Sequence, residues 1–307
     1  MGVRLNSVVV TRFFGPDQVR YIPTHSYADD TQVYISAPAI DAPSTITSFV
    51  QCVEDINIWM ARNRLKMNSD KTQVIWLGTG QQLRKITIDE LVLLSTKIPF
   101  AVSVNNLGVH VDRELSMSSH VDSVCRSGFF QLRQLRVVRS TLTPDCAKML
   151  VHAFISSRLD YCNSLLFGVS SDQLRRLQSI QNAAARVISG IRKFDHITPV
   201  LRDLHWLPVT HRITYKLAML VHKCLHGKAP SYLADCCIPV GSLSGRRQLR
   251  SATTGQLSVP RTNTNIGRRS FSVCGPSTWN SLPAALRSSD LSAGAFGREL
   301  KKHLFGS

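Results

Sequence analysis

The chain has 307 residues, 43% of them hydrophobic, and this length suggests two domains of ~150 residues, each with an apolar core. No apolar run approaches the roughly 20 residues of a membrane-spanning helix, and the first residues do not resemble a signal peptide, so we expect an intracellular protein without membrane contact. Eight cysteines without a CxxC pair favour reduced thiols over a disulfide scaffold.

The charge is distributed unevenly. Lys and Arg number 37 against 20 Asp and Glu, a net charge of +17. Residues 1–125 hold 11 basic and 12 acidic side chains, whereas residues 126–307 hold 26 basic and 8 acidic ones, a net charge of +18. This asymmetry indicates a polyanionic partner for the second part, and nucleic acid is the usual one because Lys and Arg displace counterions from phosphates. A merely basic surface or an acidic protein partner is the alternative.

The first part of the chain shows the pattern of an α+β fold, with a small antiparallel sheet and a helix. Residues 1–20 show no clear pattern. The expected elements that follow are a β-hairpin around Ala28-Asp29-Asp30, a helix over residues 43–63, a strand over residues 73–77 and short strands within residues 86–112. Two β-favouring runs flank the acidic turn of the hairpin, and apolar side chains recur at three- and four-residue steps in the helix.

The second part is predicted to be mostly helical. Helices are expected to begin near Ser116, at Thr143-Pro144, near Ser171, near Pro208 and near residue 293. Thr143 is a typical helix cap and Pro144 suits the first helical position, so this start is well defined. Arginines lie off the apolar faces of these helices and acidic residues are scarce, which favours a nucleic-acid-binding surface over a solvated face with balanced charge.

Asp29 and Asp30 are the residues most open to a chemical interpretation. Adjacent carboxylates at a hairpin tip repel each other, and Mg²⁺, which prefers carboxylate oxygens and substrate phosphates, removes that repulsion. An isolated Asp-Asp pair would be more typical of a solvated turn, because acidic turns are common. The surrounding segments decide between these two interpretations.

Several segments resemble the reverse transcriptases of jockey-like and chicken-repeat-like LINE elements. Residues 25–34, which contain Tyr27-Ala28-Asp29-Asp30, are similar to motif C, residues 65–74 to motif D and residues 104–109 to motif E, the primer grip. Residues 157–166, 181–186, 195–200, 204–209, 270–273 and 279–283 are similar to the helical region beyond, so the match covers about residues 25–305. The resemblance implies an RNA-directed DNA polymerase of a non-LTR retrotransposon, with an RNA template and a DNA primer as partners and the nucleus or cytoplasm as its location.

The resemblance also implies a domain organisation. An unrelated or disordered start over residues 1–24 would precede a partial reverse-transcriptase palm with the YADD hairpin over residues 25–115. A mostly α-helical, thumb-like region would follow over residues 116–237, and a basic C-terminal segment with a short helix would occupy residues 238–307.

The resemblance assigns roles to individual residues. Asp29 would bind the catalytic Mg²⁺, with Asp30 beside it in a weaker role, and Lys71 would be either a proton donor to pyrophosphate or a solvated lysine after a turn. Three residues would shape the floor near the primer end or position the primer backbone: Tyr27, Leu107 and Gly108. Arginines of the thumb-like region would contact phosphates without sequence specificity: Arg126, Arg133, Arg136, Arg175, Arg176 and Arg186.

The family also has parts that this sequence does not show. A further metal-binding aspartate, a glycine-containing loop and a fingers region lie upstream of YADD, and only 26 residues precede Tyr27 here. Asp17 is too close to the hairpin and follows a proline. We therefore expect a truncated palm, an incomplete Mg²⁺ site and no polymerase activity from this chain alone, with an unknown complementing half. The alternatives are a non-catalytic nucleic-acid-binding remnant or a non-functional relic of a mobile element.

Two weaker signals have simpler explanations. His and Cys residues cluster between residues 196 and 237, but only His222 and His226 have helical ligand spacing, so core or nucleic-acid-facing histidines are expected and not a zinc site. Trp206 and Trp279 could stack on bases. Each lies in a Leu-Pro context typical of a packing corner, so both are expected in the core.

Overall fold

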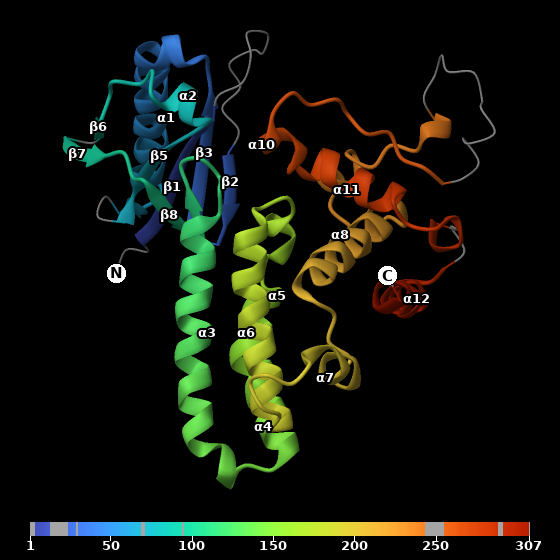
Figure 1. Cartoon of the computed structure of the whole chain (residues 1–307). Helices are drawn as coiled ribbons and strands as arrows, with labels where there is room; N and C mark the ends of the chain where they lie inside the picture. The colour runs from blue at the N-terminus through green and yellow to red at the C-terminus, as the bar shows by residue number, and fades with distance from the viewer. Residues whose placement is uncertain are drawn as a thin grey trace. The chain divides into compact units, whose positions relative to one another are not determined.

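The computed structural model describes residues 4–12, 24–28, 30–68, 71–93, 95–242, 255–287 and 291–306. The protein is α+β, and its chain divides into two compact units, Met1–His120 and Val121–Ser307 (Figure 1). The strands lie in the first unit and most helices in the second.

The main sheet of the first unit has β1 (Arg4–Arg12) at its centre. The sheet order is β2 (Thr24–Tyr27), β3 (Asp30–Ser36), β1 and β4 (Lys66–Met67), and β5 (Gln73–Leu77) also pairs with β1. β2 and β3 form the expected antiparallel hairpin, but β1 runs parallel to β3, β4 and β5. The expectation of an antiparallel sheet is therefore wrong for β1, which lies where no element was expected. Parallel strands read as continuous apolar runs such as Val8-Val9-Val10, not as an alternating pattern.

Helix α1 (Ala42–Arg62) supplies most of the core of this unit. It has Pro43 in its first turn and ends at Asn63, as its pattern predicts. Its buried residues Phe49 and Val53 pack with Val33 of β3 and Val74 of β5. The short helix α2 (Gly80–Leu83) and two antiparallel hairpins, β6 (Glu90–Leu93) with β7 (Thr96–Pro99) and β8 (Ser103–Asn106) with β9 (Val109–Asp112), complete the unit.

Helices α3 and α6 form the long pair of the second unit (Figure 1). In chain order the first elements are α3 (Ser118–Val138), α4 (Pro144–Val151), a π-helical turn (His152–Ser156), α5 (Ser157–Asp160) and α6 (Ser171–Ser189). Thr143 caps α4 by accepting a hydrogen bond from the Cys146 amide, which confirms the start predicted there. Gly128 of α3 faces Ile180 of α6, and a Cβ at that glycine would lie 2.9 Å from the isoleucine Cγ2. The absence of a side chain at Gly128 therefore permits this close approach of the two helices.

A second core of this unit lies among the later helices. These are α7 (Ile197–Asp203), α8 (Val209–Leu225), α9 (Ser231–Ala234), α10 (Asn265–Arg268), α11 (Phe271–Asn280) and α12 (Ala293–Gly306). Trp279 packs against Phe296 and Leu300, and its indole N–H donates to the Gly255 carbonyl at 2.8 Å. Trp206 is also buried, so the core assignment of both tryptophans is confirmed. No helix in the described ranges is both long and apolar enough to cross a membrane.

Candidate nucleic-acid interface

The β2–β3 hairpin presents its tip to solvent. Tyr27 pairs with Asp30 across the ladder, so two residues separate the strands of this hairpin. Two-residue hairpin turns need positive φ, and Ala28 has a φ of 53°. Tyr27 is 69% exposed and Asp30 is half-buried, whereas Asp29 lies outside the described residues. The hairpin register therefore places Tyr27 and Asp30 at the ends of the two strands, next to the turn.

The β8–β9 hairpin has a tip of similar geometry. Leu107 and Gly108 form its turn, with φ values of 47° and 81°. A left-handed backbone costs a residue with a Cβ roughly 1–2 kcal/mol, so the surrounding structure holds Leu107 in a strained conformation. Its side chain is 40% exposed. The structure thus places both residues predicted to position primer at one protruding turn.

A polar contact joins the two hairpins beneath their tips. The Gln32 side-chain amide of β3 donates to the Asn106 Oδ1 of β8 at 2.5 Å, and the Gln32 carbonyl oxygen accepts from the Tyr34 hydroxyl. Gln32 is buried, and burial raises the pKa of Tyr34, which keeps its hydroxyl protonated as a donor. None of these three residues carries a functional signal of its own in the sequence. The available signal was local, because Gln32 and Tyr34 share one face of a strand and Asn106 precedes a turn.

Lys71 lies at the same end of the main sheet as Asp30. Asn6 of β1 pairs with Asp30 on one side, and Val8 pairs with Gln73 on the other. Lys71 precedes β5 in a turn where its amide donates to the Asn68 carbonyl, and Met67 of β4, just before that turn, pairs with Leu5. Lys71 is exposed, and its assigned role in proton transfer stays a prediction.

The described residues alone do not form a site that fits Mg²⁺. Among them, no three His, Cys, Asp or Glu side chains lie close enough together to hold a metal ion. Asp30 offers one carboxylate, whereas Mg²⁺ requires near-octahedral oxygen coordination. The ring centroids of His222 and His226, the pair considered for zinc, stack 3.9 Å apart.

The arginines of α3 differ from those of α6 in their surroundings. Arg126, Arg133 and Arg136 are exposed and have no ion-pair partner within the described part of the chain. On α6, Arg175 contacts Asp172 at 3.3 Å and Arg176 donates to Asp122 of α3 at 2.6 Å. Arg186 donates to carbonyl oxygens of the loop that follows α6. The α3 arginines are therefore the ones whose guanidinium groups are open to a ligand.

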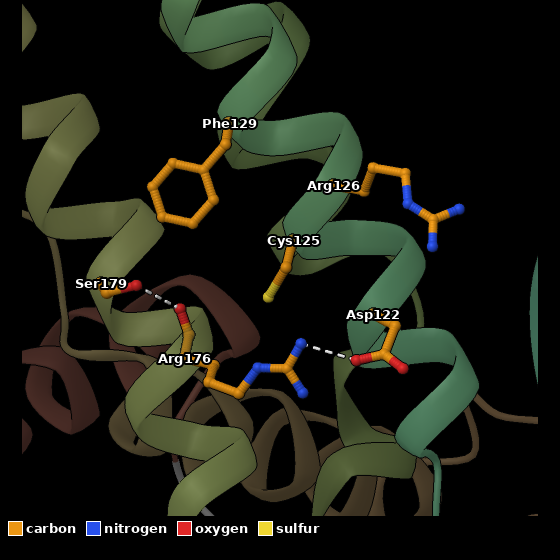
Figure 2. Close-up of a pocket in the computed structure, with 6 residues that line it drawn as sticks. All are labelled: Asp122, Cys125, Arg126, Phe129, Arg176 and Ser179. Carbon is orange, nitrogen blue, oxygen red and sulfur yellow. Dashed lines mark hydrogen bonds and ion pairs between the residues drawn. The ribbon is translucent and has the colours of Figure 1, made fainter.

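A shallow groove of about 350 Å³ lies between α3 and α6. Its lining residues are Asp122, Cys125, Arg126, Phe129, Arg176 and Ser179 (Figure 2). The Phe129 ring points into the space between the helices, whereas the Arg126 guanidinium points away from it. Burial raises the pKa of the Cys125 thiol, so this side chain of the groove is uncharged.

Comparison with known proteins gives one partial relationship of interest. The chain is 27% identical over 184 residues to the "Probable RNA-directed DNA polymerase from transposon X-element" of Drosophila melanogaster. This chain is a distant homologue of part of that polymerase. The alignment covers 58% of the chain and 19% of the polymerase. No protein-family model and no solved structure matches the chain.

This homology and the resemblance of the sequence segments point to the same family of polymerases. The structure brings Tyr27 and Asp30 to one hairpin tip and Leu107 and Gly108 to another, both in the first unit. It places the six arginines predicted to contact phosphates on two helices of the second unit. The individual roles of all these residues stay predictions.

Proposed function

We propose that this chain is part of the RNA-directed DNA polymerase of a non-LTR retrotransposon, in which the first unit belongs to the palm and the second acts as the thumb. The observation that carries this proposal is that two segments resembling polymerase motifs lie at the turns of neighbouring β-hairpins. The YADD-like and primer-grip-like segments each occupy a hairpin tip, and the Gln32–Asn106 contact links the two hairpins. The distant homology to the X-element polymerase supports the same assignment.

In this proposal the β2–β3 tip faces the primer end. Asp29 and Asp30 would be ligands of Mg²⁺, which in this reaction supplies charge neutralisation at the reacting phosphates. Ligands beyond the described residues are needed to complete its coordination. Tyr27 would contact the primer-terminal nucleotide from below, and the strained Leu107-Gly108 turn would hold the primer backbone. Lys71, at the same end of the sheet as Asp30, would stand near the outgoing pyrophosphate.

The second unit would hold the RNA template and DNA primer. Arg126, Arg133 and Arg136 are exposed on α3, and the region from residue 126 onward has a net charge of +18. Contacts from such side chains to phosphates supply affinity without reading sequence. The proposal therefore predicts binding that weakens steeply as the salt concentration rises.

We further propose that the 307-residue polypeptide binds a template–primer but does not extend it. None of the residues before Tyr27 matches the further metal-binding aspartate that the family resemblance implies. A carboxylate that bridges both metal ions is needed to align the primer hydroxyl with the nucleotide. A non-catalytic binding role is the function that the charge of the second unit favours by itself.

Primer extension tests the catalytic part of this proposal. The purified chain and its Asp29→Ala variant are given a labelled DNA primer on an RNA template with Mg²⁺ and nucleotides. We expect no extension from either protein. Extension that disappears with Asp29→Ala would mean that the polypeptide supplies the missing carboxylate, and the proposal of inactivity would be wrong.

Binding of the same template–primer tests the rest. We expect log Kd to rise linearly with log salt, by roughly 0.7–0.9 for each phosphate contacted. The double variant Arg126→Gln/Arg133→Gln should reduce that slope by about two. The charge-matched control Arg298→Gln/Lys302→Gln, on α12, should leave the affinity within a factor of two. Binding without salt dependence, or no binding, would remove the polymerase-thumb assignment.

A further inference from the structure

One face of α3 carries exposed aromatic rings between exposed arginines. Arg126, Phe130, Arg133 and Val137 follow one another at four- and three-residue steps, and Phe129 lies beside them. Phe129 is 44% exposed and Phe130 is 57% exposed. The Phe130 ring therefore shares the solvent face with the two arginines, and the Phe129 ring lies at the edge of that face toward α6.

These phenylalanines do not serve the core of the helix pair. The buried face of α3 is formed by other residues: Val121, Cys125, Gly128, Leu132 and Leu135. Phe129 and Phe130 lie off that face. A helix that bound only duplex phosphates would need cations at these positions and no large apolar rings. The rings point to a ligand that offers flat apolar surface as well as negative charge.

The groove between α3 and α6 forms a partly enclosed site around the Phe129 ring. Phe129 points into this groove, whose volume of about 350 Å³ lies at the low end of the ~300–1,000 Å³ range of ligand-binding clefts (Figure 2). The Arg176–Asp122 ion pair bridges the two helices at the groove, and the uncharged Cys125 lies between them. A planar ring can thus lie against Phe129 beside the Arg176–Asp122 pair, because the Arg126 guanidinium points away from this space.

The spacing along the helix fits a polyanionic strand with exposed bases. Arg126 and Arg133 are seven residues apart, about 10.5 Å along the helix axis, with both rings between them. A strand that ran along α3 would meet a cation, two aromatic rings and a second cation in turn. In a duplex the base faces are covered by their neighbours, so only an unpaired strand can use all four groups.

We propose that this face of α3 binds single-stranded nucleic acid, with bases stacked on Phe129 and Phe130 and phosphates contacted by Arg126 and Arg133. The inference rests on the proposed function and deepens it, because it names the form of nucleic acid that the second unit holds. Template not yet copied, or a displaced strand, has this chemistry.

The test compares two ligands of the full 307-residue chain by fluorescence anisotropy. One is a labelled 20-nucleotide oligo-dT and the other is a hairpin duplex of 20 base pairs, both at two salt concentrations. The variant Phe129→Leu/Phe130→Leu keeps exposed apolar side chains and helix propensity but removes the aromatic faces. The matched control Val138→Ala removes an exposed aliphatic group from the same helix, off the row of Arg126, Phe130 and Arg133.

We expect the leucine variant to bind oligo-dT at least tenfold more weakly than the unchanged chain, since stacking on an aromatic ring is worth about 1–3 kcal/mol per base. Its duplex affinity should change less than twofold, and the valine control should change neither. Equal losses for both ligands, or no loss for oligo-dT, would overturn the single-strand proposal while leaving duplex binding to support the polymerase assignment. No binding of either ligand by the unchanged chain would overturn both. Circular dichroism of the leucine variant identifies a folding failure, and Phe130→Leu alone then repeats the comparison.

Discussion

The two units of this protein present their candidate functional residues in different ways. In the first unit these residues lie at hairpin tips, where Ala28, Leu107 and Gly108 adopt positive φ. In the second unit they lie along helices, where exposed arginines and aromatic rings repeat with the helical period. A hairpin turn presents few side chains and leaves them little conformational freedom. An exposed helix face presents many side chains, and each keeps substantial rotamer freedom.

This difference matches the demands of the two proposed tasks. Chemistry on a nucleotide requires reacting groups to be held within a fraction of an ångström, which strained turns and buried polar contacts can provide. Phosphate binding tolerates variable geometry because it depends mainly on charge. Substitutions in the first unit should therefore affect the geometry of its hairpin turns. Substitutions on the surface of the second unit should affect the affinity for nucleic acid and the salt dependence of that affinity.

Removal of one core aromatic side chain from each unit should give the largest effects. Phe49 and Trp279 are each 1% exposed and belong to separate hydrophobic clusters. We expect Phe49→Ala and Trp279→Ala each to cost about 3–5 kcal/mol. Hydrogen exchange with mass spectrometry should show faster exchange in the unit that carries the change. Faster exchange throughout both units after either change would show that the two cores unfold together, and the division into two units would lose its energetic meaning.

A smaller effect is expected at the α3–α6 contact that frames the groove. Gly128→Ala places a methyl group 2.9 Å from the fully buried Ile180 side chain. We expect a loss of about 1–3 kcal/mol from overpacking, measured by chemical denaturation. Gly294→Ala on α12 is the matched control, because the nearest atom is the flexible end of Arg298 at 3.8 Å. It should be neutral or slightly stabilising, since alanine favours a helix.

The paired substitution Ile180→Ala separates overpacking from other causes. If the methyl group clashes with Ile180, Gly128→Ala should cost less in the Ile180→Ala background, with a coupling of roughly 0.5–3 kcal/mol. Strict additivity of the two changes would show that the helices do not approach each other at this point.

Much of the fold could be predicted from local pattern. α1 and α4 follow from hydrophobic periodicity and from start signals such as Thr143-Pro144. The β2–β3 hairpin follows from two β-favouring runs around a short turn. β1 was missed because a central strand that is paired on both sides has no alternating pattern to detect. Its parallel pairing depends on partners distant in the sequence, which local pattern does not encode.

The candidate site, like the fold, could be predicted from the sequence only where the signal was local. The residues at both hairpin tips were identified by resemblance to polymerase motifs. The Gln32–Asn106 contact was not, because it joins residues 74 positions apart. The α3 and α6 arginines looked equivalent in sequence, and only the fold shows that Arg176 is paired with Asp122 while Arg126 and Arg133 are not paired with any described acid.

The contact between the two hairpins gives the third prediction. Asn106→Ala removes the acceptor of the Gln32 amide, and we expect a loss of about 1 kcal/mol because a buried donor then lacks its partner. Asn105→Ala changes the exposed neighbour and should have little effect on stability. Faster hydrogen exchange in both hairpins of Asn106→Ala, and not in Asn105→Ala, would support the link between them. Identical behaviour of the two variants would show that the contact does not couple the tips.

The smallest effect concerns the pH dependence of the two units, each of which buries a histidine. Burial lowers the pKa of His222, with help from His226 and Lys228 nearby, and burial together with His110 lowers the pKa of His120. Each histidine therefore takes up its proton more readily in the unfolded chain. The free energy of unfolding should fall as the pH drops below about 6.5, by at most 1.36 kcal/mol per pH unit for each histidine.

Replacement of one histidine at a time assigns this pH dependence to a unit. The Nε2 of His222 lies 2.9 Å from the Leu291 carbonyl oxygen, and a glutamine amide can donate there without taking up a proton. His222→Gln should therefore flatten the loss of stability between pH 7 and pH 5 in the second unit only, and His120→Gln should do so in the first. Hydrogen exchange at both pH values separates the two contributions. If His222→Gln leaves the loss of stability of the second unit at acidic pH unchanged, other titratable groups must cause that loss, and the role given to His222 would be wrong.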